Sequence, residues 1–256
     1  MAKAFLIDVT ACTGCYACQI GCKDEHCDQA WLPYAEAQPE VGQFWLKMTE
    51  KERGANGHVR VAYVPVLGGQ NAEIAAYAPE VLMERADGLQ VIDPAKAAGR
   101  KDIAEKFEGV YWNEALGLSQ ACTGCAHLID DPASPIRTPR CVDNCAVEAI
   151  KFGEVEDLDL EGAEGGPIVW YKGLPKTFIA ATVYDPAKNE VVIGAKVTAT
   201  SAAGTYEAET DMWGDFWLKE IPAAEYAVTI EKDGKKVEMA VSTLDGDKGL
   251  KDIALA

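Results

Sequence analysis

The arrangement of the cysteines constrains this chain more than any other feature, because eight of its nine cysteines form two patterned groups. An N-terminal run with the spacing C-x2-C-x2-C-x3-C consists of Cys12, Cys15, Cys18 and Cys22. About a hundred residues downstream, a C-x2-C pair and a C-x3-C pair consist of Cys122, Cys125, Cys141 and Cys145. Runs of this kind are typical of iron–sulfur proteins, in which three closely spaced thiolates hold one cluster and the fourth ligates a neighbouring cluster.

Both groups have a three-plus-one pattern, which predicts two 4Fe–4S clusters that exchange one ligand. The first ligand set is expected to be Cys12, Cys15, Cys18 and Cys145. The second ligand set is expected to be Cys122, Cys125, Cys141 and Cys22. Cys27 fits neither set, and we expect this lone cysteine to be a small buried hydrophobe.

Structural zinc and disulfide bonds are the other common uses of paired cysteines. Zinc takes its four ligands as two pairs, which fits the N-terminal run poorly. Disulfide frameworks belong mainly to short secreted chains, whereas this chain has 256 residues and begins without a long apolar signal segment. The pattern therefore favours iron–sulfur clusters over both alternatives.

Length and charge restrict the class of protein further. A chain of 256 residues is long enough for one large or two modest domains. Its 41 acidic and 24 basic residues give a formal net charge of −17 without a basic run, so we expect no nucleic-acid partner. No apolar stretch approaches the roughly 18 residues of a membrane-spanning helix. We expect a cytoplasmic chain, or one exported while bound to a partner that carries the signal.

Local patterns predict several elements before and between the cysteines. Residues 3–9 are short and apolar, which indicates a strand, and residues 16–25 indicate a short helix after the third cysteine. Residues 81–93 indicate short strands around an Asp-Gly turn. The Asp93-Pro94 dipeptide then predicts a helix that begins with an acidic N-cap followed by proline.

We predict an α+β chain with a ferredoxin-like iron–sulfur domain over residues 1–165, a linker over 166–176 and a small β-sandwich or barrel over 177–256. The linker is expected because six acids between residues 154 and 164 precede a Gly-Gly-Pro turn. The β-domain is expected from short period-two segments separated by turns, over residues 177–184, 191–200, 205–210, 216–221, 226–231, 237–242 and 250–255.

Short motifs surround the cysteines, among them Asp24-Glu25-His26, Tyr111-Trp112-Asn113-Glu114, Cys125-Ala126-His127-Leu128 and Pro139-Arg140-Cys141. With the two cysteine groups, they make the chain resemble the iron–sulfur electron-transfer subunits of the dimethyl sulfoxide reductase family of molybdopterin enzymes. Within that family the likeness is strongest to the small subunits of transhydroxylases that act on pyrogallol. The matches extend into the β-domain, which resembles an Ig-like, carboxypeptidase-regulatory-like module.

The resemblance implies that this chain carries electrons and supplies no catalytic residue of its own. The partner would be a large catalytic subunit that binds molybdopterin with molybdenum or tungsten. Its reaction would be hydroxyl transfer between phenols such as pyrogallol, or the reductive removal of a catechol hydroxyl. Related subunits carry further cysteines between the two groups, which residues 63–70 and 106–109 of this chain lack. We therefore expect two clusters only and, where electrons enter from outside, a soluble donor.

Two functions of other classes remain open from the sequence. A free-standing two-cluster carrier would need little beyond its cysteine core, whereas the insert at residues 28–121 and the β-domain add surface that suits a permanent partner. A zinc-stabilised interaction module is the second alternative. The three histidines, His26, His58 and His127, are expected to support the structure or the cysteine ligands rather than to bind metal themselves.

Overall fold

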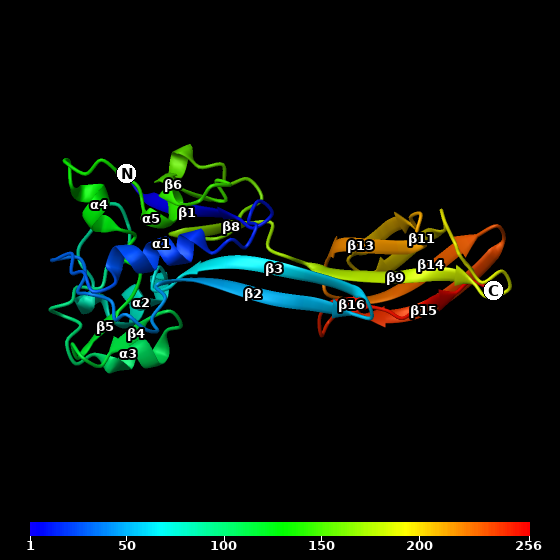
Figure 1. The fold of residues 1–256 in the computed structure, drawn as a ribbon, viewed down its shortest axis with the longest axis horizontal. Coiled ribbons are helices and arrows are strands. Elements are labelled where there is room, and N and C mark those ends of the chain that lie inside the picture. The colour runs from blue at the N-terminus through cyan, green and yellow to red at the C-terminus, as the bar shows by residue number, and fades with distance from the viewer. The chain divides into compact units, whose positions relative to one another are not determined.

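The computed structural model describes residues 1–256, which fold into two compact units (Figure 1). The first unit comprises residues 1–50 and 63–174, and the second comprises residues 51–62 and 175–256. The chain therefore passes between the units three times. Each unit has its own apolar core.

The first unit is built on a four-stranded sheet with the order β6-β1-β8-β7. Strand β1 (Lys3–Asp8) pairs antiparallel with β6 (Ile150–Glu154) and parallel with β8 (Val169–Lys172), which pairs in turn with β7 (Glu164–Gly165). Four consecutive residues of β1 are buried, as expected for a central strand covered on both faces. The predicted strand over residues 3–9 is confirmed.

The segment 166–176, predicted to be a linker, instead contains β8 of the first sheet. The Gly165-Gly166 turn where this segment begins has the flexible composition of a linker, and both glycines have positive φ. That turn nevertheless reverses the chain within the sheet, because β8 leaves it to pair with β1. The apolar residues after the turn complete the first unit, which continues to Leu174.

The helices of the first unit are short, with ten residues in the longest. They are α1 (Ala17–His26), α2 (Ala72–Tyr77), α3 (Lys101–Lys106), α4 (Ala126–Asp130) and α5 (Arg140–Asp143), with 3-10 turns η1 (Pro79–Val81) and η2 (Val155–Asp157). The predicted helix after the third cysteine is confirmed as α1. None of these helices has the length and apolar character needed to cross a bilayer.

Residues 81–93 do not form the predicted strands. The segment contains the end of η1 and one isolated bridge between Leu82 and Ile92, which is flanked by the backbone bonds from Met83 N to Val91 O and from Asp93 N to Val81 O. The prediction of a helix at Asp93 is also wrong, since only one turn forms there. The Asp93 carboxylate accepts a hydrogen bond from Ala95 N at 3.0 Å, but the chain leaves the turn at Gly99, whose φ is 74°.

The rest of the insert between the cysteine groups supplies two hairpins. The short one consists of β4 (Tyr111–Asn113) and β5 (Leu118–Gln120), packed with a satellite core that includes Ile74 and Ile103. The long one consists of β2 (Leu46–Ala55) and β3 (His58–Leu67). The long hairpin was not predicted, although Asn-Gly at residues 56–57 is a strong two-residue turn signal and both residues have positive φ.

The second unit is a small β-sandwich, as predicted for residues 177–256. One sheet combines β9 (Thr177–Asp185), β10 (Glu190–Val191), β13 (Asp215–Ile221), β16 (Lys248–Gly249) and β17 (Ile253–Ala254). The other has the order β12 (Gly204–Glu209), β11 (Lys196–Ser201), β14 (Glu225–Lys232) and β15 (Lys235–Ser242). Their alternating apolar side chains meet in one core, which includes Phe216, Val228 and Ile230.

The tip of the long hairpin, residues 51–62, belongs to this second unit. Arg53 Nη1 lies 3.1 Å from the Asp247 carboxylate, and both side chains are largely buried. Asn56 Nδ2 donates to Gly249 O at 2.7 Å. A Cβ at Gly249 would lie 2.0 Å from Ala55 O, so only glycine allows this close backbone approach. The β-domain is therefore completed by residues from the insert.

An Arg53→Met variant is expected to lower the free energy of unfolding of the second unit by about 3–5 kcal/mol, because it leaves the Asp247 carboxylate buried without its cation. Chemical denaturation followed by tryptophan fluorescence, to which Trp217 of the second unit contributes, measures this loss. Adding Asp247→Asn should recover part of it, since the uncompensated charge is removed. The matched control is Arg60→Gln, because the Arg60–Glu220 pair is exposed and should change stability by less than about 1 kcal/mol.

Candidate metal centre

The same tetrapeptide, Cys-Thr-Gly-Cys, forms both cysteine loops, at residues 12–15 and 122–125. Gly14 and Gly124 have φ values of 67° and 62°, a left-handed conformation that glycine adopts without strain. The first loop leads into α1 and the second into α4. The repeated tetrapeptide is visible in the sequence, and it indicates that the two loops are built alike.

The structure brings the four thiols of the first ligand set together. Burial raises the pKa of Cys12, and the neighbouring thiolates of Cys145 and Cys15 raise it further by repulsion. Burial also raises the pKa of Cys18 to about 11, with added repulsion from the same group of sulfurs. Cys145, which follows α5, thus lies beside the N-terminal loop although more than a hundred residues separate them.

The thiols of the second ligand set also lie together. Burial raises the pKa of Cys22 well above its ordinary value, and repulsion from Cys122 and Cys125 adds to this. Burial likewise raises the pKa of Cys141, with repulsion from Cys125, Cys122 and Cys22. Cys122 and Cys125 reach pKa values of about 11 and about 12, chiefly through burial. Cys22 therefore lies with the downstream cysteines, and Cys18 of the first ligand set adds a smaller repulsion.

A close contact between α1 and α5 produces this exchange of cysteines. A Cβ at Gly21 would lie 1.8 Å from Asn144 Nδ2, so the absence of a side chain lets the two helices meet. Helix α1 carries Cys18 and Cys22, while α5 and the turn after it carry Cys141 and Cys145. Helix α1, and α5 with the turn after it, therefore each contribute one thiol to each set.

The two sets differ in exposure. All four cysteines of the second ligand set are buried. In the first ligand set only Cys18 is buried, whereas Cys15 is exposed. Cys27 is half-buried rather than buried as predicted. Its thiol is not among the groups that raise the pKa values of Cys12 and Cys22. The first ligand set thus lies at the surface of its unit and the second lies inside it.

The donors around the sulfurs fit an iron–sulfur cofactor. All nine cysteines are free thiols, so none is used in a disulfide. Backbone N–H groups point at three of the sulfurs: Gly124 N lies 3.3 Å from Cys122 Sγ, Arg140 N lies 3.5 Å from Cys125 Sγ and Ala149 N lies 3.2 Å from Cys145 Sγ. Such N–H groups stabilise the negative charge of ligating thiolates. No cluster of three His, Cys, Asp or Glu side chains converges tightly enough to chelate a single ion.

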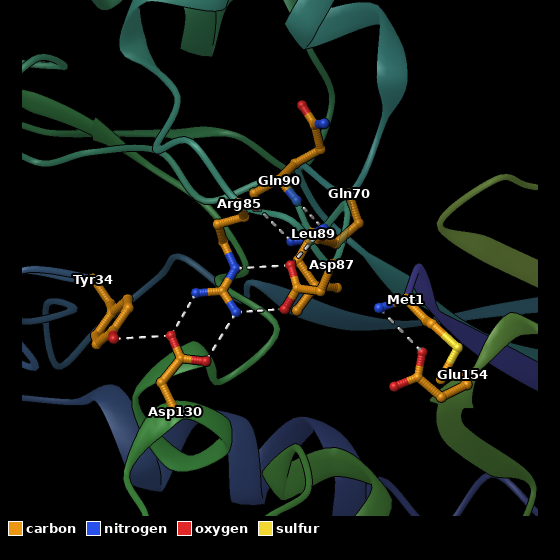
Figure 2. Close-up of polar contacts among 9 residues, drawn as sticks. All are labelled: Met1, Tyr34, Gln70, Arg85, Asp87, Leu89, Gln90, Asp130 and Glu154. Carbon is orange, nitrogen blue, oxygen red and sulfur yellow. Dashed lines mark hydrogen bonds and ion pairs between the residues drawn. The ribbon is translucent and has the colours of Figure 1, made fainter.

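Gln70 anchors the second cysteine loop, a role that sequence analysis missed. Its Nε2 donates to Cys122 O and to Gln90 O, both at 2.7 Å, while its Oε1 accepts from Gln90 N at 3.1 Å. Figure 2 shows the Gln70 side chain beside Gln90. A buried glutamine that bonds two backbone segments fixes the position of both. Nothing local in the sequence pairs residues 70 and 122.

Arg85 fastens the segment 81–93 to α4 (Figure 2). Its guanidinium donates to Asp87 Oδ1 at 3.0 Å and to Asp130 Oδ2 at 2.7 Å, and Tyr34 OH donates to the same Asp130 oxygen at 2.9 Å. The Arg85 side chain is 9% exposed, so these bonds replace its hydration. Because α4 begins directly after Cys125, this network helps to fix the second ligand set.

A Gln70→Met variant should loosen the Cys122 loop, because it leaves the Cys122 carbonyl and Gln90 N without their partners at a cost of about 1–3 kcal/mol. We expect faster loss of iron from the second ligand set to a chelator, followed by visible absorbance and electron paramagnetic resonance. The control is Gln38→Met. Gln38 is fully buried but its amide has no partner, so this variant should retain iron as the wild type does.

Glu25 joins two further residues near the second ligand set. It accepts from Arg140 Nε at 2.6 Å and pairs with His127 Nε2 at 3.0 Å. Burial opposes the charge of Glu25, yet hydrogen bonds from His127 and Arg140 outweigh it and lower the pKa of that carboxyl. Arg140 is thus engaged by an acidic side chain of its own unit.

The three histidines have different surroundings. His58 lies in the second unit and faces Asp215 at 3.5 Å. His127 stacks on the Trp31 ring with centroids 4.4 Å apart. His26 is almost completely buried, which lowers its pKa to about 3, and its Nε2 lies 3.8 Å from Cys125 Sγ. Only His26 therefore contacts a cysteine sulfur.

Comparison with known proteins agrees with this architecture. Residues 179–256 match the family model of the carboxypeptidase regulatory-like domain. The whole chain is similar to the pyrogallol hydroxytransferase small subunit of Pelobacter acidigallici, with 33% identity over 90% of both chains. It is also similar to the B subunit of the anaerobic dimethyl sulfoxide reductase of Escherichia coli, with 27% identity over 60% of this chain and 74% of the relative. The thiosulfate reductase electron transfer subunit of Salmonella typhi is 25% identical over 61% of this chain and 78% of its own length.

Two sets of thiols in one compact unit, followed by a regulatory-like β-sandwich, define the class of iron–sulfur electron-transfer subunits. Within it, the chain belongs to the family of small subunits of molybdopterin enzymes, shown by its similarity over nearly its full length to the hydroxytransferase small subunit. The resemblance found in the sequence is therefore confirmed. Membership also implies a large catalytic partner.

Proposed function

We propose that this chain binds two 4Fe–4S clusters in a ferredoxin-like first unit and exchanges electrons with a molybdopterin-bearing subunit that acts on polyhydroxylated aromatics. The first ligand set would hold one cluster and the second ligand set the other. The grouping of the thiols carries the proposal: Cys145 lies with the N-terminal loop and Cys22 lies with the downstream cysteines. This is the exchange that two adjacent clusters require.

The residues around the thiols do what such an electron-transfer site needs. When bound, the clusters supply sites for single electrons. The chain would bury the second ligand set, direct backbone N–H groups at the sulfurs and fix the loops through Gln70 and Arg85. Because burial keeps the free thiols protonated, loading of iron must displace their protons. Because Cys15 is exposed, we propose that the first ligand set is the one nearer to the partner.

The substrate class rests on a relative that is similar over nearly the whole chain and is named a pyrogallol hydroxytransferase small subunit. We infer that the large partner of this chain carries molybdenum or tungsten on its pterin and performs hydroxyl transfer or dehydroxylation of pyrogallol-type phenols. Dehydroxylation needs a source of electrons, for which we propose a soluble donor. We place the complex in the cytoplasm, with export on a signal-bearing partner as the alternative.

Co-expression of this chain with its native large subunit tests the proposal. The complex should contain about eight iron and eight sulfide per copy of this chain and should convert pyrogallol-type phenols. This chain purified alone should show cluster absorbance without turnover. Iron near four per chain would contradict the two-cluster assignment. Turnover by the isolated chain, or a native partner without a pterin, would contradict the proposed role.

A further inference from the structure

His26 occupies a position beside the second ligand set that the cluster assignment does not use. It ends α1, four residues after Cys22, so both side chains lie on one face of that helix. The imidazole is 1% exposed and packs against the Trp45 ring at 4.8 Å and the His127 ring at 5.3 Å between centroids. These rings hold the imidazole with its Nε2 atom 3.8 Å from Cys125 Sγ.

The chemistry of the sulfur decides which ring nitrogen carries the hydrogen. No carboxylate bonds the His26 ring, because Glu25 is occupied by His127 and Arg140. A buried ring without an acidic partner is neutral and has one N–H. A cysteine sulfur that ligates metal has only lone pairs, which would repel the lone pair of an unprotonated Nε2. The hydrogen therefore belongs on Nε2, leaving Nδ1 as the acceptor without a partner.

We propose that His26 donates an Nε2–H···S hydrogen bond to Cys125 and thereby raises the reduction potential of the cluster on the second ligand set. The inference rests on the proposed function, since it requires that set to hold a cluster. Reduction adds negative charge to a cluster and its sulfurs, so a donor on a ligand sulfur stabilises the reduced form more than the oxidised form. His26 is a positioning residue, because it acts through Cys125.

The contact distinguishes the two ligand sets. Cys125 receives donors from two sides, the His26 ring and the backbone N–H of Arg140. The first ligand set has a backbone donor at Cys145, from Ala149 N, but none of the three histidines of the chain contacts its sulfurs. The pattern C-x3-H at the end of α1 could have indicated this residue from the sequence. Because only the second ligand set has a side-chain donor, the reduction potentials of the two clusters should differ from the values that ligation by four cysteines alone would give.

Redox titration of the complex, monitored by electron paramagnetic resonance, tests the inference. His26→Phe removes the donor and keeps a ring between Trp45 and His127. At a fixed potential we expect the oxidised-to-reduced ratio of the second cluster to rise at least tenfold, which is a fall of about 59 mV for a one-electron couple. The first cluster should be unchanged. His58→Gln, which changes a buried histidine in the other unit, should alter neither potential.

Pulsed electron paramagnetic resonance of the wild-type complex gives a test that needs no variant. With ¹⁵N confined to histidine, the reduced second cluster should show a ¹⁵N coupling and the first should show none. Equal coupling at both clusters, or none at the second, would overturn the proposal, as would a second-cluster potential unchanged in His26→Phe with full iron content. Absence of iron from the wild-type complex would instead refute the proposed function.

Discussion

A Cys22→Ser variant is expected to lose the cluster on the second ligand set and to keep the one on the first. The physical reason is the position of Cys22 on α1. Repulsion from Cys122 and Cys125 acts on its thiol more strongly than repulsion from Cys18, its neighbour in sequence. Replacing a thiolate ligand by a hydroxyl removes a strong soft donor from iron, and the set has no spare thiol to replace it. Iron content should fall to about half of the wild-type value.

Cys27→Ser is the matched control, because it makes the same change five residues further on at a half-buried thiol outside both sets. It should retain both clusters. The spectra of Cys18→Ser complete the comparison, since this variant should damage the first ligand set instead. Loss of the first cluster in Cys22→Ser, with the second intact, would disprove the exchanged assignment. Loss of iron in Cys27→Ser would show that the ligand sets are miscounted.

Removal of the β-sandwich is expected to weaken association with the large subunit at least tenfold while both clusters remain. A chain ending at Leu174 retains the complete first unit, with both ligand sets and the four-stranded sheet. It also keeps the hairpin tip, residues 51–62, without the strands against which that tip packs. The simple truncation should therefore be prone to aggregate, because the tip loses its contacts with Asp247 and Gly249 and leaves its backbone unpaired.

A second truncation separates docking from solubility. Replacing residues 51–62 by Asn-Gly closes the hairpin with a two-residue turn inside the first unit. This variant should stay soluble, show the two-cluster spectrum and bind the large subunit more weakly than the full chain in a calibrated pull-down or calorimetric titration. Binding equal to that of the full chain would refute a docking role for the sandwich. Loss of both clusters would show that the first unit depends on the second.

The sequence by itself determined the features that depend on local spacing. The two cysteine groups are recognisable because a loop must offer thiols at short, regular intervals to surround a cluster. The β-sandwich is recognisable because its strands alternate between a buried and an exposed face, as in β14, where Tyr226, Val228 and Ile230 are buried. The full-length similarity to a hydroxytransferase small subunit confirms the family that these motifs indicated.

The tertiary structure alone decided the features that depend on contacts between distant residues. The segment of strand β8 was predicted to be a linker, and only its pairing with β1 makes it a strand. The hairpin tip joins the β-sandwich through partners such as Asp247, which is nearly two hundred residues from Arg53 in the sequence. Gln70 and His26 show the same limit at the candidate site, since Cys122 and Cys125 are brought to them by folding. Spacing along the chain encodes which residues form a loop, whereas the packing of loops and helices decides which side chains meet.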